Sequence, residues 1–277
     1  DKDPLDPLQG AAQDKCSSLH TTLLLRETIA YNLERNSSVY VAMLDTQKAF
    51  DTVWVNGLLY TLHQSGMDPV LWRLLLELYT GFICHIKIDG KLSEGFEAGQ
   101  GVHQGAPWSM YLFEKLYDKL ITYLKDSNMN AKIAHLKTGV PTFADDLSIA
   151  CLHKPLLQAQ LNKVYEFSRK WRFTFNPSKS VLLIFGEDMS PDLPIVLGRT
   201  EIAVSKSDVH MGVYIGEGLL SEKAYIKKRI QKARQAFFIS QAMGSRSVPV
   251  SPSAMSKLYW TVCIPRMTYG SRGTSFA

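Results

Sequence analysis

A short apolar run that ends in an aspartate is the feature that most restricts how this chain can fold. Residues 38–44 read Ser-Val-Tyr-Val-Ala-Met-Leu, and Asp45 follows directly. Because apolar residues occupy consecutive positions, the run predicts a strand that is buried on both faces. A charged side chain at the mouth of a buried strand is costly unless something compensates its charge. Asp45 is therefore a candidate functional residue.

Helices and strands alternate along the rest of the chain. We expect helices at residues 17–33, 55–63, 69–79, 108–125, 155–171, 221–243 and 253–263, and strands at 84–88, 92–97, 181–185, 195–197 and 210–215. Asp89-Gly90 is expected to turn one hairpin, and residues 132–151 are expected to form a single second hairpin folded near Asp145. This order predicts an α+β fold, with a helical C-terminal part that begins near residues 216–218.

Composition excludes several classes of protein. The chain is 45% hydrophobic and 21% charged, the balance of a globular protein rather than a disordered one. No apolar run approaches the ~20 residues that cross a bilayer, so we expect no membrane partner and an intracellular location, in the nucleus and cytoplasm. The four cysteines are far apart and form no C-x-x-C pair, which argues against a zinc site or a disulfide framework. A net charge of +5 permits a nucleic-acid partner without demanding one.

Asp145 and Asp146 form the second candidate group, inside the apolar sequence F-A-D-D-L at residues 143–147. A solvated turn explains one aspartate, because Asp favours turns. Two adjacent carboxylates repel each other, and a bound divalent cation reverses that cost. Taken alone, the pair is compatible with either a turn or a metal site.

Six ordered segments resemble the reverse transcriptases of non-LTR (LINE-type) retrotransposons. They are L-D-T-Q-K-A-F-D (44–51), G-V-H-Q-G-A-P-W-S (101–109), F-A-D-D (143–146), N-P-S-K-S (176–180), H-M-G-V (210–213) and L-Y-W-T-V-C-I-P-R-M-T-Y-G-S (258–271). Each motif alone is weak, whereas six in the family's order are specific.

The resemblance implies a right-hand polymerase. Its α+β palm with an antiparallel sheet would span residues 36–217, between partial fingers at 1–35 and a partial helical thumb at 218–277. It implies an RNA-directed DNA polymerase that adds deoxynucleotides to a primer 3′-hydroxyl by two-metal-ion nucleotidyl transfer. The implied partners are an RNA template, a DNA primer and a dNTP, and the implied cofactor is Mg²⁺ as two ions, with Mn²⁺ as a substitute.

The same resemblance assigns roles to the residues around the carboxylates. Asp45 and Asp145 would ligate both metal ions, Asp146 would support them, and the backbone carbonyl of Thr46 would complete one coordination sphere. Lys179 matches a lysine that protonates the leaving pyrophosphate. A solvent-facing lysine at a strand edge explains Lys179 equally well.

Further residues are expected to contact the nucleotide. Phe50 lies where the family places a bulky gate against the ribose 2′-hydroxyl, although composition alone favours a core aromatic. Glycines at 101 and 105 would let the backbone approach the nascent base pair, and Gln104 and Ser109 would contact template or nucleotide. A plain loop that enters a helix is the alternative interpretation of this second motif.

The long basic helix is expected to grip the template–primer duplex through phosphates. Its cationic residues are Lys223, Lys227, Lys228, Arg229, Lys232 and Arg234. A solvated helix face is the alternative for such a charge run.

A catalytically inactive retrotransposon remnant that binds nucleic acid is the alternative function. Residues 7–15 stand where the family has a glycine- and arginine-rich triphosphate-binding segment, and only Lys15 is positive there. Ala106, Trp108 and Met110 also depart from the second motif. An RNA-dependent RNA polymerase would share the palm, but Phe50 argues against this activity because RNA synthesis must admit the ribose 2′-hydroxyl. A hydrolase of another fold explains none of the ordered motifs.

Overall fold

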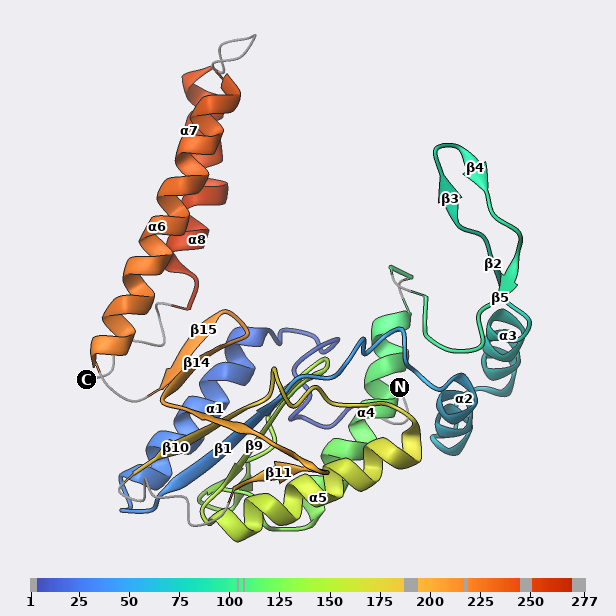
Figure 1. Cartoon of the computed structure of the whole chain (residues 1–277), viewed down its shortest axis with the longest axis horizontal. Coiled ribbons are helices and arrows are strands. Elements are labelled where there is room, and N and C mark those ends of the chain that lie inside the picture. The colour runs from blue at the N-terminus through green and yellow to red at the C-terminus, as the bar shows by residue number, and fades with distance from the viewer. Residues whose placement is uncertain are drawn as a thin grey trace. The chain divides into compact units, whose positions relative to one another are not determined.

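The protein divides into two compact units, Asp1–Val204 and Ser205–Ala277 (Figure 1). The structure, a computed structural model, describes residues 4–103, 105–106, 108–186, 194–216, 219–244 and 251–270. Within those ranges no helix combines the length and the apolar character that a bilayer span requires. The four cysteines, all described, are free thiols.

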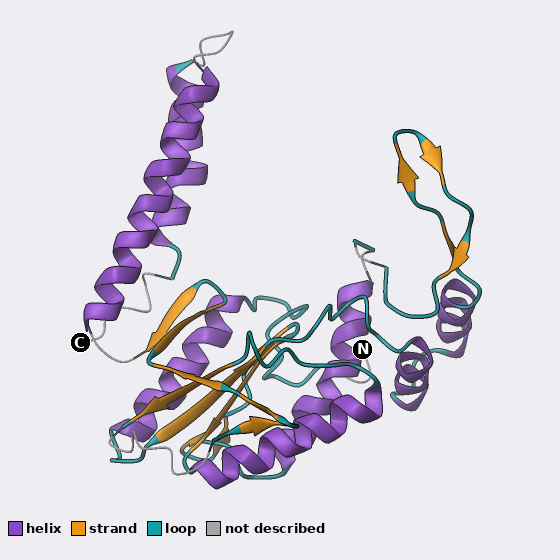
Figure 2. Ribbon diagram, in the orientation of Figure 1, coloured by secondary structure: helices purple, strands orange, loops and turns teal. Residues whose placement is uncertain are grey.

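A five-stranded sheet forms the centre of the first unit (Figure 2). In spatial order its strands are β13 (Ala203–Ser205), β10 (Val181–Phe185), β1 (Val39–Leu44), β9 (Asp146–Cys151) and β8 (Thr142–Phe143). β1 pairs antiparallel with β10 on one side and with β9 on the other, where Leu44 lies opposite Leu147. All six residues of β1 are buried, which confirms the strand that the apolar run predicts.

Three helices cover the two faces of this sheet (Figure 1). They are α1 (Ser18–Leu33), α4 (Ser109–Asp126) and α5 (Lys154–Trp171), each within a residue of its predicted bounds. Successive side chains of a strand point to opposite faces. Tyr40, Ala42 and Leu44 of β1 share one core cluster with α4 and α5, whereas the buried Leu25 and Ile29 of α1 lie outside that cluster. Because α1 packs against β1, β8 and β9, it covers the opposite face.

Two shorter helices follow β1, as predicted. They are α2 (Val55–Gln64) and α3 (Pro69–Tyr79). Asp68 caps α3, because its side chain accepts hydrogen bonds from the backbone amides of Val70 and Leu71 at 2.9 and 3.2 Å. Pro69 occupies the first turn, where a missing N–H costs nothing.

The hairpin predicted around Asp89-Gly90 forms, but each of its strands is interrupted. Its segments are β2 (Ile83–Cys84), β3 (Lys87–Ile88), β4 (Lys91–Leu92) and β5 (Phe96–Glu97), with β2 paired to β5 and β3 to β4. Asp89 and Gly90 have φ of 49° and 81°, two positive values that match a type I′ turn. Between the two ladders the Ser93 hydroxyl accepts a hydrogen bond from the Ile86 amide at 2.9 Å, and this side-chain bond replaces a ladder bond.

The single hairpin predicted for residues 132–151 is wrong, because two hairpins form. β6 (Lys132–Ile133) pairs with β7 (Leu136–Lys137), and β8 pairs separately with β9. The first turn contains Ala134, whose φ is 51°. Because an alanine at positive φ gives no sequence signal for a turn, the extra reversal was missed.

The single strand predicted at residues 210–215 is also wrong. Met211 and Gly212 have φ of 50° and 76°, so they turn a hairpin between β14 (Ser207–His210) and β15 (Val213–Gly216). A further small hairpin joins β11 (Val196–Leu197) to β12 (Thr200–Glu201), where one strand was expected.

In the second unit, helices pack beside the β14–β15 hairpin. α6 (Leu219–Gly244) contacts α7 (Pro252–Leu258), a π-helical turn (Tyr259–Cys263) and α8 (Ile264–Thr268). Tyr225 and Tyr269 donate hydrogen bonds from their hydroxyls to the carbonyls of Gly212 and Met211, the latter at 3.0 Å. The hairpin therefore belongs to the helical unit, and the units divide at residue 204 rather than near 216–218. The assignment of fingers, palm and thumb stays a prediction.

Ile149→Ala is expected to lower the free energy of unfolding by about 2–5 kcal/mol, because it leaves a cavity beneath the sheet. Ile149 is 0% exposed in the core of β9. Urea denaturation followed by circular dichroism measures the change. Leu92→Ala, at a 66% exposed position of β4, is the control and should leave the midpoint almost unchanged. Equal stability of the two variants would contradict the assigned core.

Candidate active site

Three aspartates meet at one edge of the central sheet. Asp45 follows the last residue of β1, Asp145 lies in the turn between β8 and β9, and Asp146 is the first residue of β9. Because Leu44 pairs with Leu147 across β1 and β9, the end of one strand meets the start of the other. The pairing thus places at one sheet edge aspartate residues that are 100 positions apart in the sequence, Asp45 and Asp145.

The carboxylates interact electrostatically. Burial, followed by the negative charges of Asp145 and Asp45, raises the pKa of Asp146 to about 6. Burial also raises the pKa of Asp145. A hydrogen bond from its own backbone amide lowers this pKa in part, and the negative charge of Asp45 raises it. Like charges close together in a partly dry site have this effect. A cation bound among them would relieve the repulsion.

Two buried hydroxyls support the main chain beneath the aspartates. The Thr46 and Tyr117 hydroxyls lie 3.0 Å apart, and each lies 3.4 Å from the carbonyl oxygen of Asp145. Burial raises the pKa of Tyr117 above its ordinary value, so this hydroxyl stays protonated. Tyr117 comes from α4, and its hydrogen bond connects this helix to the turn that carries Asp145. The backbone of Thr46 forms an antiparallel bridge with Phe175.

Lys179 reaches the first aspartate. Its Nζ atom lies 3.8 Å from the Oδ2 atom of Asp45, and its side chain is 68% exposed. A turn beginning at Asn176 presents it: the amide of Asn176 donates to the carbonyl of Asp45 at 2.8 Å. An exposed ion pair contributes at most about 1 kcal/mol of stability. Its position beside Asp45 is compatible with both interpretations of this lysine.

The first and second sequence motifs are joined through their backbones. The amides of Gly101 and Val102 donate to the carbonyls of Val53 and Phe50, both at 2.9 Å. Gly101 has φ of 93°, and a Cβ there would lie 3.0 Å from the carbonyl oxygen of Asp51. A glycine is therefore required where the two loops touch.

The residues predicted to contact nucleotide have different environments. The half-buried Phe50 packs against Phe113, with ring centroids 5.0 Å apart. Gly105 has φ of 85° and open space where a Cβ would be. Ser109 is 2% exposed, and its hydroxyl has no hydrogen-bond partner among the described residues. Gln104 lies outside the described residues.

Most cations of the basic helix face solvent. The exposed ones are Lys223, Lys227, Lys228, Lys232 and Arg234. Arg229 differs, because its guanidinium donates to the carbonyl of Tyr269 at 3.1 Å and lies 5.3 Å from the centre of that ring. Arg229 therefore has a packing role inside the second unit, whatever the other cations bind.

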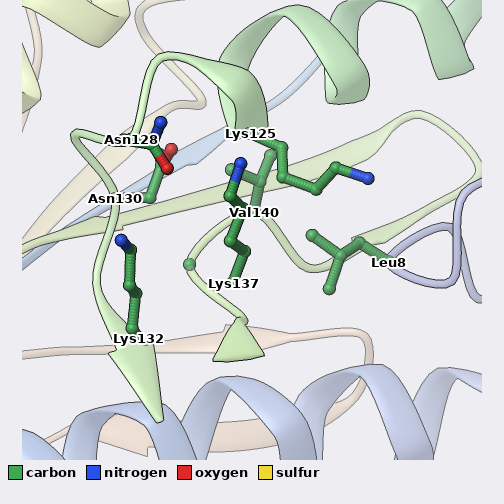
Figure 3. Close-up of a pocket in the computed structure, with 8 residues that line it drawn as sticks. Leu8, Lys125, Asn128, Asn130, Lys132, Lys137 and Val140 are labelled. Carbon is green, nitrogen blue, oxygen red and sulfur yellow. The ribbon is translucent and has the colours of Figure 1, made fainter. Parts of the chain in front are cut away.

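A cluster of three lysines elsewhere in the first unit is not a ligand site. Figure 3 shows Lys125, Lys132 and Lys137 among the residues that line a small pocket, together with Leu8. The pocket has no room for a water molecule. Lys125 is already bound to Asp6, and none of the three catalytic candidates lines this space.

Comparison with known proteins decides the family. The family model described as reverse transcriptase (RNA-dependent DNA polymerase) matches residues 5–233. The chain belongs to the reverse transcriptase family. It is 34% identical over 130 residues to the retrovirus-related Pol polyprotein of the type-2 retrotransposable element R2DM of Drosophila melanogaster, covering 47% of this chain and 12% of that protein. It is 24% identical over 193 residues to the RNA-directed DNA polymerase of the mobile element jockey of Drosophila funebris. This match covers 68% of this chain and 20% of that protein.

The solved structures confirm the right-hand polymerase fold. The chain superimposes on apo telomerase of Candida tropicalis with a TM-score of 0.52 and 14% identity, over 75% of this chain and 39% of that one. R2 and jockey relatives likewise confirm the resemblance to non-LTR reverse transcriptases. The chain spans 12% to 27% of the length of the first curated relatives it matches.

The carboxylates of this member of the family fit a divalent metal ion, which the family generally uses. Within the described ranges no three Asp, Glu, His or Cys side chains are gathered into a metal-binding group. Mg²⁺ does not require such a group, because it binds one or two carboxylates and completes its shell with water and substrate phosphates. The side chain of Asp45 is 38% exposed, and its oxygens are the hard donors that Mg²⁺ prefers.

Sequence reasoning missed two residues of this site, Tyr117 and Gln9. Tyr117 has a weak signal, since it follows Phe113 by four positions on the buried face of α4. Gln9 has none, because it lies in a segment that reads as loop. In the structure its side chain hydrogen-bonds the backbone of Ala144, next to Asp145.

Asp146→Asn is expected to raise the free energy of unfolding at pH 7 by on the order of 1 kcal/mol, after discounting for solvent screening. The folded pKa of Asp146, about 6, exceeds the ordinary value of 3.8. Protonated Asp146 therefore makes its full contribution to the free energy of unfolding below about pH 4, and this contribution is lost as the pH rises through 6. Urea unfolding at pH 4 and pH 7 measures the difference. Asp14→Asn, at an exposed position, is the control, and an unchanged stability of Asp146→Asn at both values would contradict the shift.

Proposed function

We propose that this chain catalyses RNA-directed DNA synthesis, extending a DNA primer on an RNA template with deoxynucleoside triphosphates. The observation that supports it is the meeting of Asp45 with Asp145 and Asp146 at one sheet edge, in a member of the reverse transcriptase family. A protein that only bound phosphates would gain nothing from three carboxylates near them, because like charges repel.

In the proposed reaction the primer 3′-oxygen attacks the α-phosphorus of the dNTP. A new P–O bond forms, the bond from the α-phosphorus to the bridging oxygen breaks, and pyrophosphate leaves. Two Mg²⁺ ions, or Mn²⁺, held by Asp45 and Asp145 with support from Asp146, would supply Lewis-acid stabilisation of the developing charge. Thr46 and Tyr117 hold the main chain at Asp145, and such fixed positioning contributes much of the rate.

Lys179 is proposed to protonate the leaving pyrophosphate. Its ammonium lies 3.8 Å from Asp45, so it is held at the edge where the reaction occurs while remaining accessible to a bound nucleotide. The exposed cations of α6 are proposed to bind phosphates of the duplex without reading its sequence. Gly105, Gln104 and Ser109 are proposed to lie beside the template or the incoming nucleotide.

Asp145→Asn is expected to lower primer extension by roughly 10³-fold, because metal-assisted charge stabilisation contributes several kcal/mol. Extension of a labelled DNA primer on RNA with Mg²⁺ measures it. Asp126→Asn, at a position 63% exposed, is the control and should match the parent. Duplex binding, measured by fluorescence anisotropy, should be nearly equal for all three proteins.

The rival function is a nucleic-acid-binding remnant without turnover. The segment at residues 7–15 supports it, because only Lys15 offers a positive charge where a triphosphate would be bound. Duplex binding without extension by the parent would establish the remnant. Extension by Asp145→Asn at the parent's rate would remove the proposed role of the carboxylates.

Phe50→Ala is expected to reduce the preference for deoxynucleotides over ribonucleotides by about 10- to 100-fold, because the ring would no longer collide with the 2′-hydroxyl. The ratio of kcat/KM values for a dNTP and the matching ribonucleotide measures it. Phe96→Ala, at a 49% exposed position of β5, is the control. An unchanged ratio would make Phe50 simply a partner of Phe113 in the core.

A further inference from the structure

The N-terminal segment of the first unit lies against the strand that leads into the catalytic turn. The amide of Thr142 in β8 donates to the carbonyl of Leu8, and the amide of Gly10 donates to the carbonyl of Thr142, both at 2.8 Å. Between them Gln9 forms a parallel bridge with Thr142. A Cβ at Gly10 would lie 2.2 Å from the Thr21 hydroxyl. The segment is therefore closely packed between α1 and β8.

The side chain of Gln9 extends from this segment to the turn itself. Gln9 is 0% exposed. Its Nε2 group donates to the carbonyl of Ala144 at 3.2 Å, and its Oε1 atom accepts from the amides of Ala144 and Ala11 at 2.9 and 3.2 Å. One side-chain amide thus satisfies both backbone groups of Ala144. The three bonds fix which end of the Gln9 amide is nitrogen.

Ala144 is a residue whose conformation needs such support. It has φ of 55°, a left-handed conformation that costs an alanine on the order of 1–2 kcal/mol. Its carbonyl belongs to the peptide group that joins it to Asp145. The orientation of that peptide group decides where the carboxylates of Asp145 and Asp146 point. A buried peptide group without a partner would also be costly.

We propose that Gln9 is a positioning residue of the polymerase site, which fixes the Ala144–Asp145 peptide and thereby the direction of the catalytic carboxylates. The inference rests on the proposed function. A neutral amide suits this role, because it binds the main chain without adding a charge that would pair with the aspartates. Residues 7–15 stand where the family has a triphosphate-binding segment, and in this proposal they also form part of the wall of the active site.

The anchoring of the segment supports this role. Asp6 is bound to Lys125 of α4, and its amide donates to the Asp118 carboxylate at 2.7 Å. Gln13 donates from its side chain to the carbonyl of Asp6 at 2.8 Å. Gln9 is therefore held by its own neighbours and is rigid enough to position the turn.

The chain offers a matched control in Gln158 of α5. Its Nε2 group donates to the carbonyl of Val196, and its Oε1 atom accepts from the amide of Val196, both at 2.9 Å. Gln158 thus makes the same pair of bonds to a single residue, but at β11 rather than at the aspartates. Gln9→Leu and Gln158→Leu each remove one such pair.

Two readouts test the proposal. The first is hydrogen exchange of the Ala144 amide by NMR, which needs no activity, and Gln9→Leu should speed it by about tenfold or more relative to parent and Gln158→Leu.

The second readout is steady-state primer extension. Gln9→Leu should lower kcat by about 10- to 100-fold with KM for the dNTP within about threefold, because misplaced groups cost rate rather than affinity. Gln158→Leu should keep both values near the parent's.

Gln9→Asn covers the case in which Gln9→Leu fails to fold. It keeps a neutral amide whose side chain is one methylene shorter, so its bonds to Ala144 are weakened without a new charge and an intermediate fall in kcat is expected. Parent-like exchange and kcat in the folded Gln9 variants would overturn the proposal, as would an equal kcat loss in Gln158→Leu. If the parent extends no primer, the proposed polymerase function is wrong, but the role of Gln9 is still tested. Hydrogen exchange of the Ala144 amide then decides whether Gln9 fixes the turn.

Discussion

The antiparallel pairing of β1 with β9 is the interaction on which the rest of the site depends. Its register places Leu44 opposite Leu147, so the aspartates that flank these two leucines lie at the same edge. A slip by one residue would turn every side chain of the strand to the opposite face. Alternate residues of β1 pack beneath α4 and α5 on one face and against α1 on the other, so a slip would exchange the side chains that fit each helix layer.

Carboxylates at that edge carry a cost of burial and of mutual repulsion, visible in the raised pKa values of Asp145 and Asp146. Neutral groups support the site instead of opposing charges: Thr46, Tyr117 and Gln9 all bind the main chain at residues 144 and 145. The backbone is thus held in place while the carboxylate repulsion remains for a cation to relieve. The exposed Lys179 is the one described cation with an ion pair to these aspartates.

The elements that the sequence predicted well are those with strong local signals. The apolar run of β1, the Asp68-Pro69 start of α3 and the Asp89-Gly90 turn all formed where expected. The errors occurred at reversals that lack an Asp-Gly or Asn-Gly pair. Ala134 and Met211 adopt positive φ, which neither residue type indicates, and surrounding contacts such as the Tyr269 hydroxyl bond to Met211 stabilise the turn.

The sequence by itself determined the family and singled out the three aspartates as candidates, because the motifs of the family are short, ordered and chemically distinctive. It also determined the central strand, since burial on both faces requires a continuous apolar run. Only the tertiary structure decided what supports those carboxylates. Gln9 lies in a loop and Tyr117 in an ordinary helix, and both reach Ala144–Asp145 across more than 25 residues of chain. Such contacts depend on how distant segments pack, which no local pattern in the sequence specifies.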